Sequence, residues 1–153
     1  MSLTEIPPQQ PHGTVVVHEA GTGRYVQHVR MGVHLADADE PEDVGGQNRG
    51  PNPYEFLLAA LGTCTSMTLR MYAEMKKLPL ERVAVRLVHS KIHAQDCAEC
   101  ETREGKVDQI EREITLEGPL SDEQRARLLE IANKCPVHRT LTSEIRIVSR
   151  LAD

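Results

Sequence analysis

Two cysteines in this chain lie where a thiol could do chemistry. Cys64 sits inside an uncharged stretch, 56–69, and Cys135 ends a second helical pattern directly before Pro136. Taken one at a time, each is most simply a small buried hydrophobe. The two are far apart in the chain, so only the tertiary fold can bring them together. If it does, they form a thiol-based redox site, in which one thiolate reacts and a second thiol closes a disulfide.

A second group of potential ligands follows the spacing H-x3-H-x3-C-x2-C and consists of His89, His93, Cys97 and Cys100. Imidazoles and thiolates are zinc ligands, but only the cysteine spacing is typical of a zinc knuckle. Three interpretations stay open for this group: a metal site, a redox dithiol that relays electrons to the main pair, or a plain surface loop. We assign no metal ligands among the expected site residues.

The composition is that of a folded globular protein of 153 residues, with 39% apolar and 27% charged residues. We expect a single domain over residues 13–151, preceded by a flexible lead-in over 1–12. A net charge of −5 argues against nucleic acid as a partner, because phosphate binding needs a basic surface. The uncharged stretch 56–69 is too short to span a bilayer, so we expect no membrane partner.

The start of the chain is polar and rich in proline, without the apolar segment of a secretory signal. We therefore expect a cytoplasmic protein. In that compartment cysteines stay reduced, so the four cysteines are expected to be thiols available for catalysis or metal, not a structural disulfide framework.

Hydrophobic periodicity and turn residues predict an α+β fold. In the first part of the chain, the predicted elements are a strand from Val15, a turn at 21–23, a strand at 25–36 and a loop at 38–50. A helix follows from Pro53 to about Lys77, and then two strands at 81–94 and 107–116, separated by a loop at 95–105. The last predicted elements are a helix opened by a capping box at 121–124 and a strand at 142–151.

The long helix is expected to begin with Asn52 as its N-cap and Pro53 at the first helical position. Its first half offers no polar face to water, and a helix that is apolar all round must be covered all round. A partner subunit could supply that cover, so we expect a homodimer. In the second helix, four residues are predicted to face inward: Leu128, Leu129, Ile131 and Ala132.

The stretch from Gly50 to Cys64, followed by Cys135-Pro136-Val137-His138, resembles the OsmC/Ohr family, and the order of elements agrees over about residues 13–150. The resemblance implies an OsmC-like fold, with antiparallel strands around a long buried central helix, in an intertwined homodimer. It also implies a thiol peroxidase that reduces organic hydroperoxides. Cys64 would be the peroxidatic residue and Cys135 the resolving one, with no cofactor but an external dithiol reductant.

The resemblance also implies a cation and a carboxylate at the site. Arg24 matches the arginine that such proteins carry in the N-terminal hairpin, where it lowers the pKa of the attacking thiol. Glu55 is the candidate for the glutamate that holds this arginine. It lies nine positions before Cys64, whereas the organic-hydroperoxide-resistance branch has its glutamate ten before, where this chain has Tyr54. Glu55 can therefore serve only if the helix begins irregularly or if it reaches a site in the partner subunit.

An alternative from another class is a non-catalytic protein that keeps the fold and binds a small molecule or a metal. The displaced Glu55 and the extra cluster over 89–100 favour this alternative. Thiol reactivity and the metal content of the protein distinguish the two hypotheses.

Overall fold

The computed structural model describes residues 10–152, so most of the lead-in expected over 1–12 lies outside the described residues. In the part of the lead-in that is described, the Gln10 N–H donates to the Gly32 carbonyl at 3.2 Å. The chain forms two compact units. One consists of the chain before Leu57 together with the chain after Arg146, and the other is Leu57–Arg146.

The first unit contains a three-stranded antiparallel sheet in the order β1-β2-β3. Its strands are β1 (Val15–Glu19), β2 (Gln27–Met31) and β3 (His34–Ala38). The single strand expected over 25–36 is wrong, because the chain turns at Gly32 and Met31 pairs with His34. Gly32 has a φ of 61°, which glycine adopts without steric cost. The turn expected at 21–23 is confirmed as part of the connection between β1 and β2.

The loop expected over 38–50 is confirmed, apart from Ala38 at the end of β3, and it is organised by a buried carboxylate. Asp39 accepts backbone N–H groups from Glu40, Gln47 and Arg49 at 2.8, 3.0 and 3.2 Å. Burial raises the pKa of Asp39, but these three hydrogen bonds and the Arg49 charge outweigh it and hold the pKa below its ordinary value. A short 3-10 turn, η2 (Glu42–Val44), lies within the loop.

Helix α1 (Pro53–Lys76) begins and ends as its sequence predicts. Asn52 Oδ1 accepts the Glu55 N–H at 2.9 Å, and Glu55 Oε2 accepts the Asn52 N–H at 2.8 Å. This reciprocal capping box satisfies two backbone donors at the helix start. At the other end Lys77 takes a left-handed φ of 55°, which stops the helix before Pro79.

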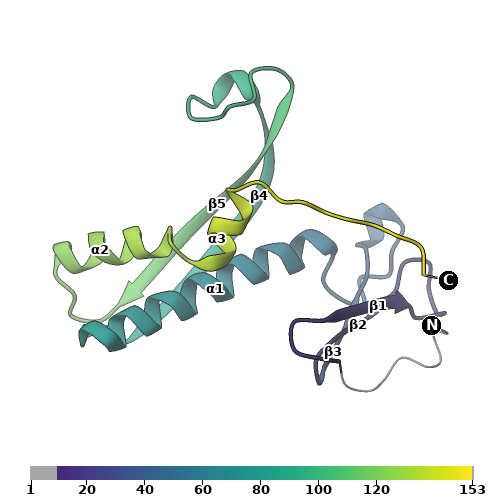
Figure 1. Cartoon of the computed structure of the whole chain (residues 1–153), viewed down its shortest axis with the longest axis horizontal. Coiled ribbons are helices and arrows are strands. Elements are labelled where there is room, and N and C mark those ends of the chain that lie inside the picture. Colours follow the sequence, from purple (N-terminus) through teal and green to yellow (C-terminus); the bar gives the residue numbers. More distant parts are fainter. Residues whose placement is uncertain (1–9, 153) are drawn as a thin grey trace. The chain divides into compact units, whose positions relative to one another are not determined.

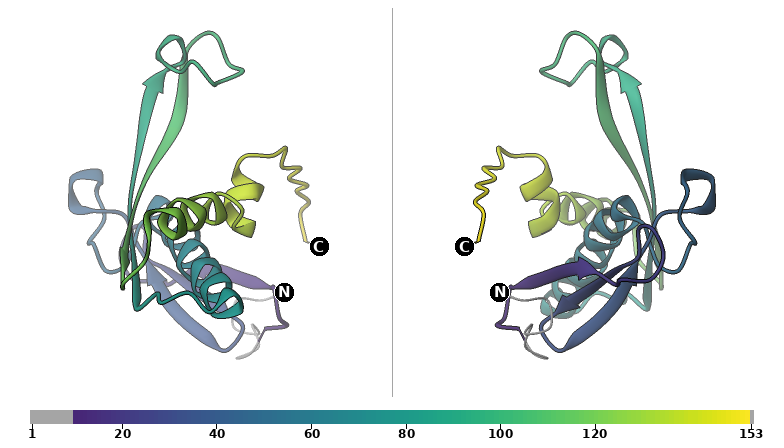
Figure 2. Two further views of the ribbon diagram at one scale, coloured as in Figure 1. Left: turned by 90° about the vertical axis from the view of Figure 1, so that its left-hand side faces the viewer. Right: turned by 90° about the vertical axis from the view of Figure 1, so that its right-hand side faces the viewer.

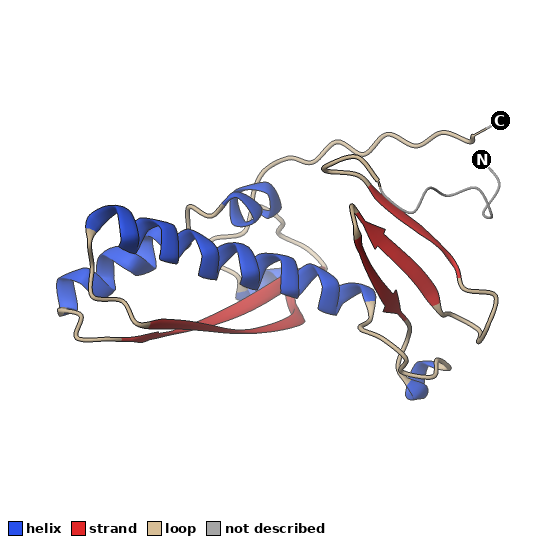
Figure 3. Cartoon of the chain, turned by 90° about the horizontal axis from the view of Figure 1, so that it is seen from below, coloured by secondary structure: helices blue, strands red, loops and turns tan. Residues whose placement is uncertain are grey.

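The second unit packs helices against a long hairpin (Figures 1 and 3). Its elements after α1 are β4 (Arg82–His93), the 3-10 turn η3 (Ala94–Asp96), β5 (Lys106–Glu117), α2 (Asp122–Ala132) and α3 (Pro136–Leu141). Strands β4 and β5 pair in antiparallel register along their full length. The capping box expected at the start of α2 is confirmed, with Ser121 and Gln124 exchanging hydrogen bonds.

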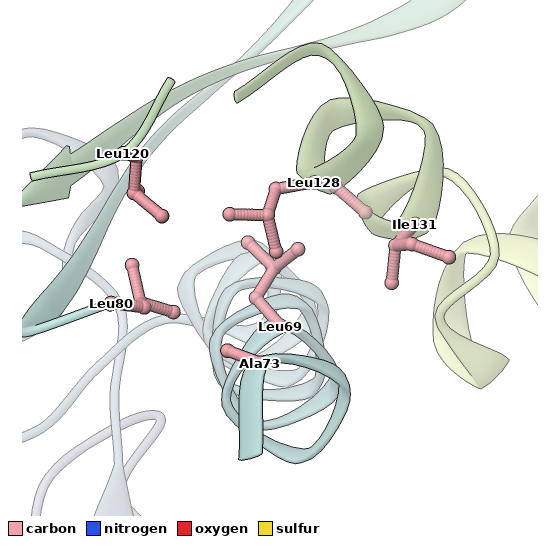
Figure 4. Packing of buried hydrophobic residues seen from close by; sticks show 7 residues of the cluster. Leu69, Ala73, Leu80, Leu120, Leu128 and Ile131 are labelled. Atoms are coloured by element: carbon pink, nitrogen blue, oxygen red, sulfur yellow. The ribbon is translucent and has the colours of Figure 1, made fainter. Parts of the chain in front are cut away.

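The core of this unit lies between α1, α2 and the hairpin (Figure 4). Leu69 and Leu128 are fully buried and pack together with Ile131 and Ala132 of α2. The inward placement of these α2 residues is confirmed. Leu129 is the exception, at 57% exposed, because one residue along a helix turns the side chain by about 100° to a different face.

Helix α1 is covered on one side only within the described chain. Its buried residues are Leu61, Gly62, Thr65, Leu69 and Ala73. On another face, Met67, Met71 and Met75 are 59%, 67% and 67% exposed. The central helix is thus not buried all round by its own chain, as expected if a partner subunit supplies the remaining cover.

The strand expected over 142–151 is wrong for the single chain, which is irregular after α3. A strand is stable only when a neighbour pairs with its backbone, and among residues 10–152 this segment has no such neighbour. Its apolar residues are therefore left uncovered, with Ile147 84% and Leu151 94% exposed. No helix within residues 10–152 has the length and apolar character needed to cross a membrane.

Candidate functional site

The fold of the second unit brings Cys64 and Cys135 together, and both are free thiols. Cys64 projects from the middle of α1, and its Sγ accepts the Val137 N–H at 3.5 Å. Cys135 is the N-cap of α3, and its Sγ accepts the His138 N–H at 3.4 Å. The Cys64 side chain lies close enough to Cys135 to lower the pKa of that thiol. The first turn of α3 therefore holds both sulfurs, which allows a disulfide to form between them.

The two cysteines differ in exposure and in electrostatic surroundings. Cys135 is fully buried, whereas Cys64 is half-buried. Burial raises the pKa of Cys135, but the His138 N–H, the contacts with the Thr65 and Cys64 side chains and the charge of Arg112 together outweigh it. The pKa of Cys135 is therefore held below its ordinary value, which favours the thiolate.

Arg112 is the cation that the fold places beside Cys135. From strand β5, its Nη1 donates to Thr65 Oγ1 at 2.9 Å and to the Ala132 carbonyl at 3.3 Å. Its Nη2 donates to Asn133 Oδ1 at 2.8 Å. All three acceptors are neutral, and within residues 10–152 no carboxylate forms an ion pair with Arg112. The guanidinium charge is thus left available to a thiolate.

Thr65 connects Arg112 to Cys135. Its hydroxyl is buried, donates to the Leu61 carbonyl at 2.7 Å and lies 3.7 Å from Cys135 Sγ. Sequence reasoning missed both Thr65 and Arg112. A signal for Arg112 was present, because it shares the strand parity of Ile110 and puts a charge on the apolar face of the hairpin.

A cavity of about 400 Å³ opens beside this network, although neither cysteine lines it. Its walls are mainly apolar, and the polar side chains in it include those of Arg112 and His138. The lining residues are Leu61, Asp108, Ile110, Arg112, Leu129, Asn133, His138, Leu141 and Thr142. Burial, and to a lesser degree the charge of Arg112, lowers the pKa of His138, so its imidazole is neutral at pH 7.

Two further residues of the expected site lie in other surroundings. Arg24 belongs to the first unit, where its guanidinium lies 5.0 Å from the ring centroid of Tyr25. Its pairing with Cys64 stays a prediction. Glu55 caps the start of α1, and because the helix begins regularly, its face is half a turn away from that of Cys64. An irregular helix start is thus excluded, and a role for Glu55 in a site of the partner subunit stays a prediction.

The second cluster does not come together as a metal site. His89 Nε2 lies 2.8 Å from Asp108 Oδ1, and Cys97 forms a disulfide with Cys100. Among residues 10–152, no group of three or more His, Cys, Asp or Glu side chains is arranged to hold a metal ion. The expectation that these cysteines are thiols is therefore wrong in this structure.

Comparison with known proteins gives the following likenesses. The family model described as OsmC-like protein matches residues 46–150. An organic hydroperoxide resistance protein OsmC from Legionella pneumophila is 21% identical, with 84% of this chain and 88% of that chain covered and a TM-score of 0.62. The organic hydroperoxide resistance protein OhrB of Bacillus subtilis is 18% identical, with 84% and 89% covered and a TM-score of 0.57.

A third solved structure, an OsmC-like protein from Mycoplasma pneumoniae, is 18% identical, with 84% of each chain covered and a TM-score of 0.61. At these identities the likeness is one of fold. No curated protein matches the chain.

Proposed function

The chain belongs to the OsmC-like family, and from that membership we propose that it is a thiol-dependent peroxidase that reduces organic hydroperoxides to alcohols. The structures that share its fold include organic hydroperoxide resistance proteins. The observation that carries the proposal is the pair of free thiols, Cys64 and Cys135, held together by the first turn of α3.

In the proposed reaction the Cys64 thiolate attacks the outer oxygen of the hydroperoxide. The O–O bond breaks, the alkoxide takes a proton and leaves as an alcohol, and Cys64 becomes a sulfenic acid. The Cys135 thiolate then attacks the Cys64 sulfur, an S–S bond forms and the hydroxyl leaves as water. An external dithiol supplies the two electrons and two protons that restore both thiols.

The surroundings of Cys135 support its role as the resolving residue. A resolving thiol must be ionised to attack, and the network of Arg112 and Thr65 favours that form. The same network makes Cys135 a good leaving group when the dithiol attacks Cys64, because a low thiol pKa speeds departure. Cys64 is the more exposed of the two, which supports its assignment as the sulfur that meets peroxide and reductant.

The neighbouring cavity supports an organic substrate. Four of its nine lining residues are leucine or isoleucine, and these favour an alkyl group over hydrogen peroxide. The same cavity is the observation that favours the alternative, a non-catalytic small-molecule-binding protein, because no cysteine lines it. Reactivity of Cys64 toward an alkyl hydroperoxide decides between the two.

We further propose that the working form is an intertwined homodimer. The exposed methionines of α1 (Met67, Met71 and Met75) and the uncovered apolar residues after α3 are surfaces that a second copy would cover. Arg24 and Glu55 are proposed to complete the site within this assembly, with Arg24 assisting ionisation of Cys64. No cofactor is required, and reduction by a dithiol suits a cytoplasmic setting.

The test uses a Cys97→Ser/Cys100→Ser background, so that Cys64 and Cys135 are the only cysteines. Cumene hydroperoxide should consume both thiols and produce a Cys64–Cys135 cross-link that peptide mass spectrometry identifies. Cys135→Ser should instead accumulate a sulfenic acid at Cys64, which dimedone traps. Unchanged thiols after peroxide treatment refute the peroxidase, and dimedone trapped at Cys135 in Cys64→Ser, with full peroxide consumption, refutes the assigned roles.

A further inference from the structure

The tip of the β4–β5 hairpin carries the one disulfide of the described residues, between Cys97 and Cys100. Figures 1 and 2 show this tip standing away from the helices of its unit. Both cysteines are half-buried, and the residues between them, Ala98 and Glu99, are exposed. The sulfurs are therefore at a protruding, accessible place rather than in a packed core.

The disulfide is not needed to hold the hairpin together. Strand pairing is complete up to His93 and Lys106, and the Ala94 N–H donates to the Gly105 carbonyl at 2.9 Å beyond that pair. Ala94 itself is only 3% exposed, so the base of the tip is packed. The cross-link closes a ring over just two intervening residues, which constrains the unfolded chain far less than a long loop would. Opening it should leave β4 and β5 in register.

The tip is also separate from the thiol pair. Strand β5 runs from Arg112, beside Cys135, to Lys106 before it reaches the tip, a span of about 20 Å at roughly 3.3 Å per residue. A disulfide requires Cα atoms within about 7 Å of each other. Cys97 and Cys100 can therefore exchange with a thiol from outside the chain but not with Cys64 or Cys135 of their own subunit.

We propose that Cys97 and Cys100 form a second redox site, a dithiol–disulfide couple that exchanges with external thiols independently of the Cys64–Cys135 pair. One thiolate of an external dithiol attacks a tip sulfur, the S–S bond breaks and the other tip cysteine leaves as a thiolate that takes up a proton. The second thiol of the reductant then attacks the mixed disulfide. The reductant is oxidised to its own disulfide, and the tip gains two electrons and two protons.

The charge around the tip selects the kind of thiol. Four exposed carboxylates flank the disulfide: Asp96, Glu99, Glu101 and Glu104. Two cations lie nearby, Arg103 and Lys106, so the negative charge of the tip is in excess. An approaching anion is repelled, so neutral dithiols and cationic thiols should react faster than anionic thiols such as glutathione. At low salt we expect the rate constant for exchange, calculated per thiolate, to differ roughly fivefold between neutral and anionic thiols. This difference in rate should shrink as added salt shortens the Debye length.

The experiment uses the full chain with Cys64→Ser/Cys135→Ser, in which the tip pair is the only pair of cysteines. Serine is itself a good N-cap, so α3 keeps its start. The folded protein is equilibrated with mixtures of reduced and oxidised dithiothreitol, quenched by alkylation and analysed by peptide mass. We expect reversible two-electron interconversion of Cys97 and Cys100, with far-ultraviolet circular dichroism unchanged.

Charge selection is measured with three monothiols: cysteamine, 2-mercaptoethanol and glutathione. Their rate constants for opening the tip disulfide are compared per thiolate at low and high salt. Glu99→Gln/Glu101→Gln is the matched variant and should reduce the difference in rate constant between the three thiols. A tip disulfide that opens only on unfolding overturns the proposal, as does a reduced tip that oxidised dithiothreitol fails to close. Equal rates for all three thiols overturn the assigned selectivity. Because this variant lacks Cys64 and Cys135, its result is independent of whether the protein reduces hydroperoxides.

Discussion

Replacing Arg112 by glutamine should reduce the ionisation of Cys135. Arg112 Nη1 lies 2.9 Å from Thr65 Oγ1, and that oxygen lies 3.7 Å from Cys135 Sγ, so cation and sulfur are within about 7 Å. At an effective dielectric constant of about 20, a full charge pair at this distance attracts by roughly 2 kcal/mol. Because Arg112 is only half-buried, water screens part of this attraction. We therefore expect the guanidinium to stabilise the Cys135 thiolate by about 1–1.5 kcal/mol.

The loss corresponds to roughly a tenfold smaller thiolate fraction at pH values below the pKa of Cys135. Its sign follows from the charge: the cation favours the thiolate, so its removal raises the pKa of Cys135. Resolution of the Cys64 sulfenic acid should slow by a similar factor, since the thiolate is the attacking form. Arg112→Lys keeps the charge and should preserve most of the effect.

Titration by nuclear magnetic resonance of isotopically labelled cysteine is the direct assay, because Cys135 is fully buried and alkylation would report its exposure instead. The measurement is made on reduced protein in the Cys97→Ser/Cys100→Ser background, with chemical denaturation to check the fold. Arg112→Gln also loses hydrogen bonds to buried acceptors, at a cost of about 1–3 kcal/mol in unfolding free energy. Identical Cys135 titration curves for Arg112→Gln, Arg112→Lys and the parent would refute the reasoning.

Three other outcomes follow from the structure. Thr65→Val leaves an Arg112 N–H without its acceptor and should lower the unfolding free energy by about 1–3 kcal/mol in urea denaturation, more than Thr65→Ser; equal losses would contradict the role of the hydroxyl. The folded-state pKa of Asp39 is depressed, so its stabilising contribution is present above its ordinary pKa and is lost as pH falls through the folded value. Asp39→Asn should reduce the loss of unfolding free energy at acid pH. An unchanged pH dependence of the unfolding free energy would contradict this role of Asp39. Met71→Lys places a charge on the exposed face of α1 and should shift the proposed dimer to monomer in sedimentation, whereas Glu101→Lys, exposed at the hairpin tip, should not.

Local signals determined much of the fold. Asn52, Pro53 and Glu55 specify the start of α1 through contacts within four residues, and the box opening α2 does the same. Alternation over β4 and β5 predicted both strands to within about two residues. The two cysteine motifs were also sufficient to indicate the family, because each is read from contiguous residues.

Other elements could be placed only with their neighbours present. Periodicity runs through Gly32 without a break, and only the pairing of Met31 with His34 reveals two strands there. The segment after α3 has a strand-like pattern, yet no strand forms in the single chain because its backbone lacks a partner. The disulfide at the hairpin tip likewise depended on a loop conformation that spacing alone left open.

Only some residues of the candidate site could be identified from the sequence. By itself the sequence identified Cys64 and Cys135 as the reactive candidates, since residue type and helical context are local properties. It did not identify Arg112, because a strand arginine becomes the counter-ion of a thiolate only when α1, β5 and the α2–α3 junction pack around it. Hydrogen bonds and Coulomb attraction act over a few ångströms, and these groups are brought within that range only by the tertiary fold.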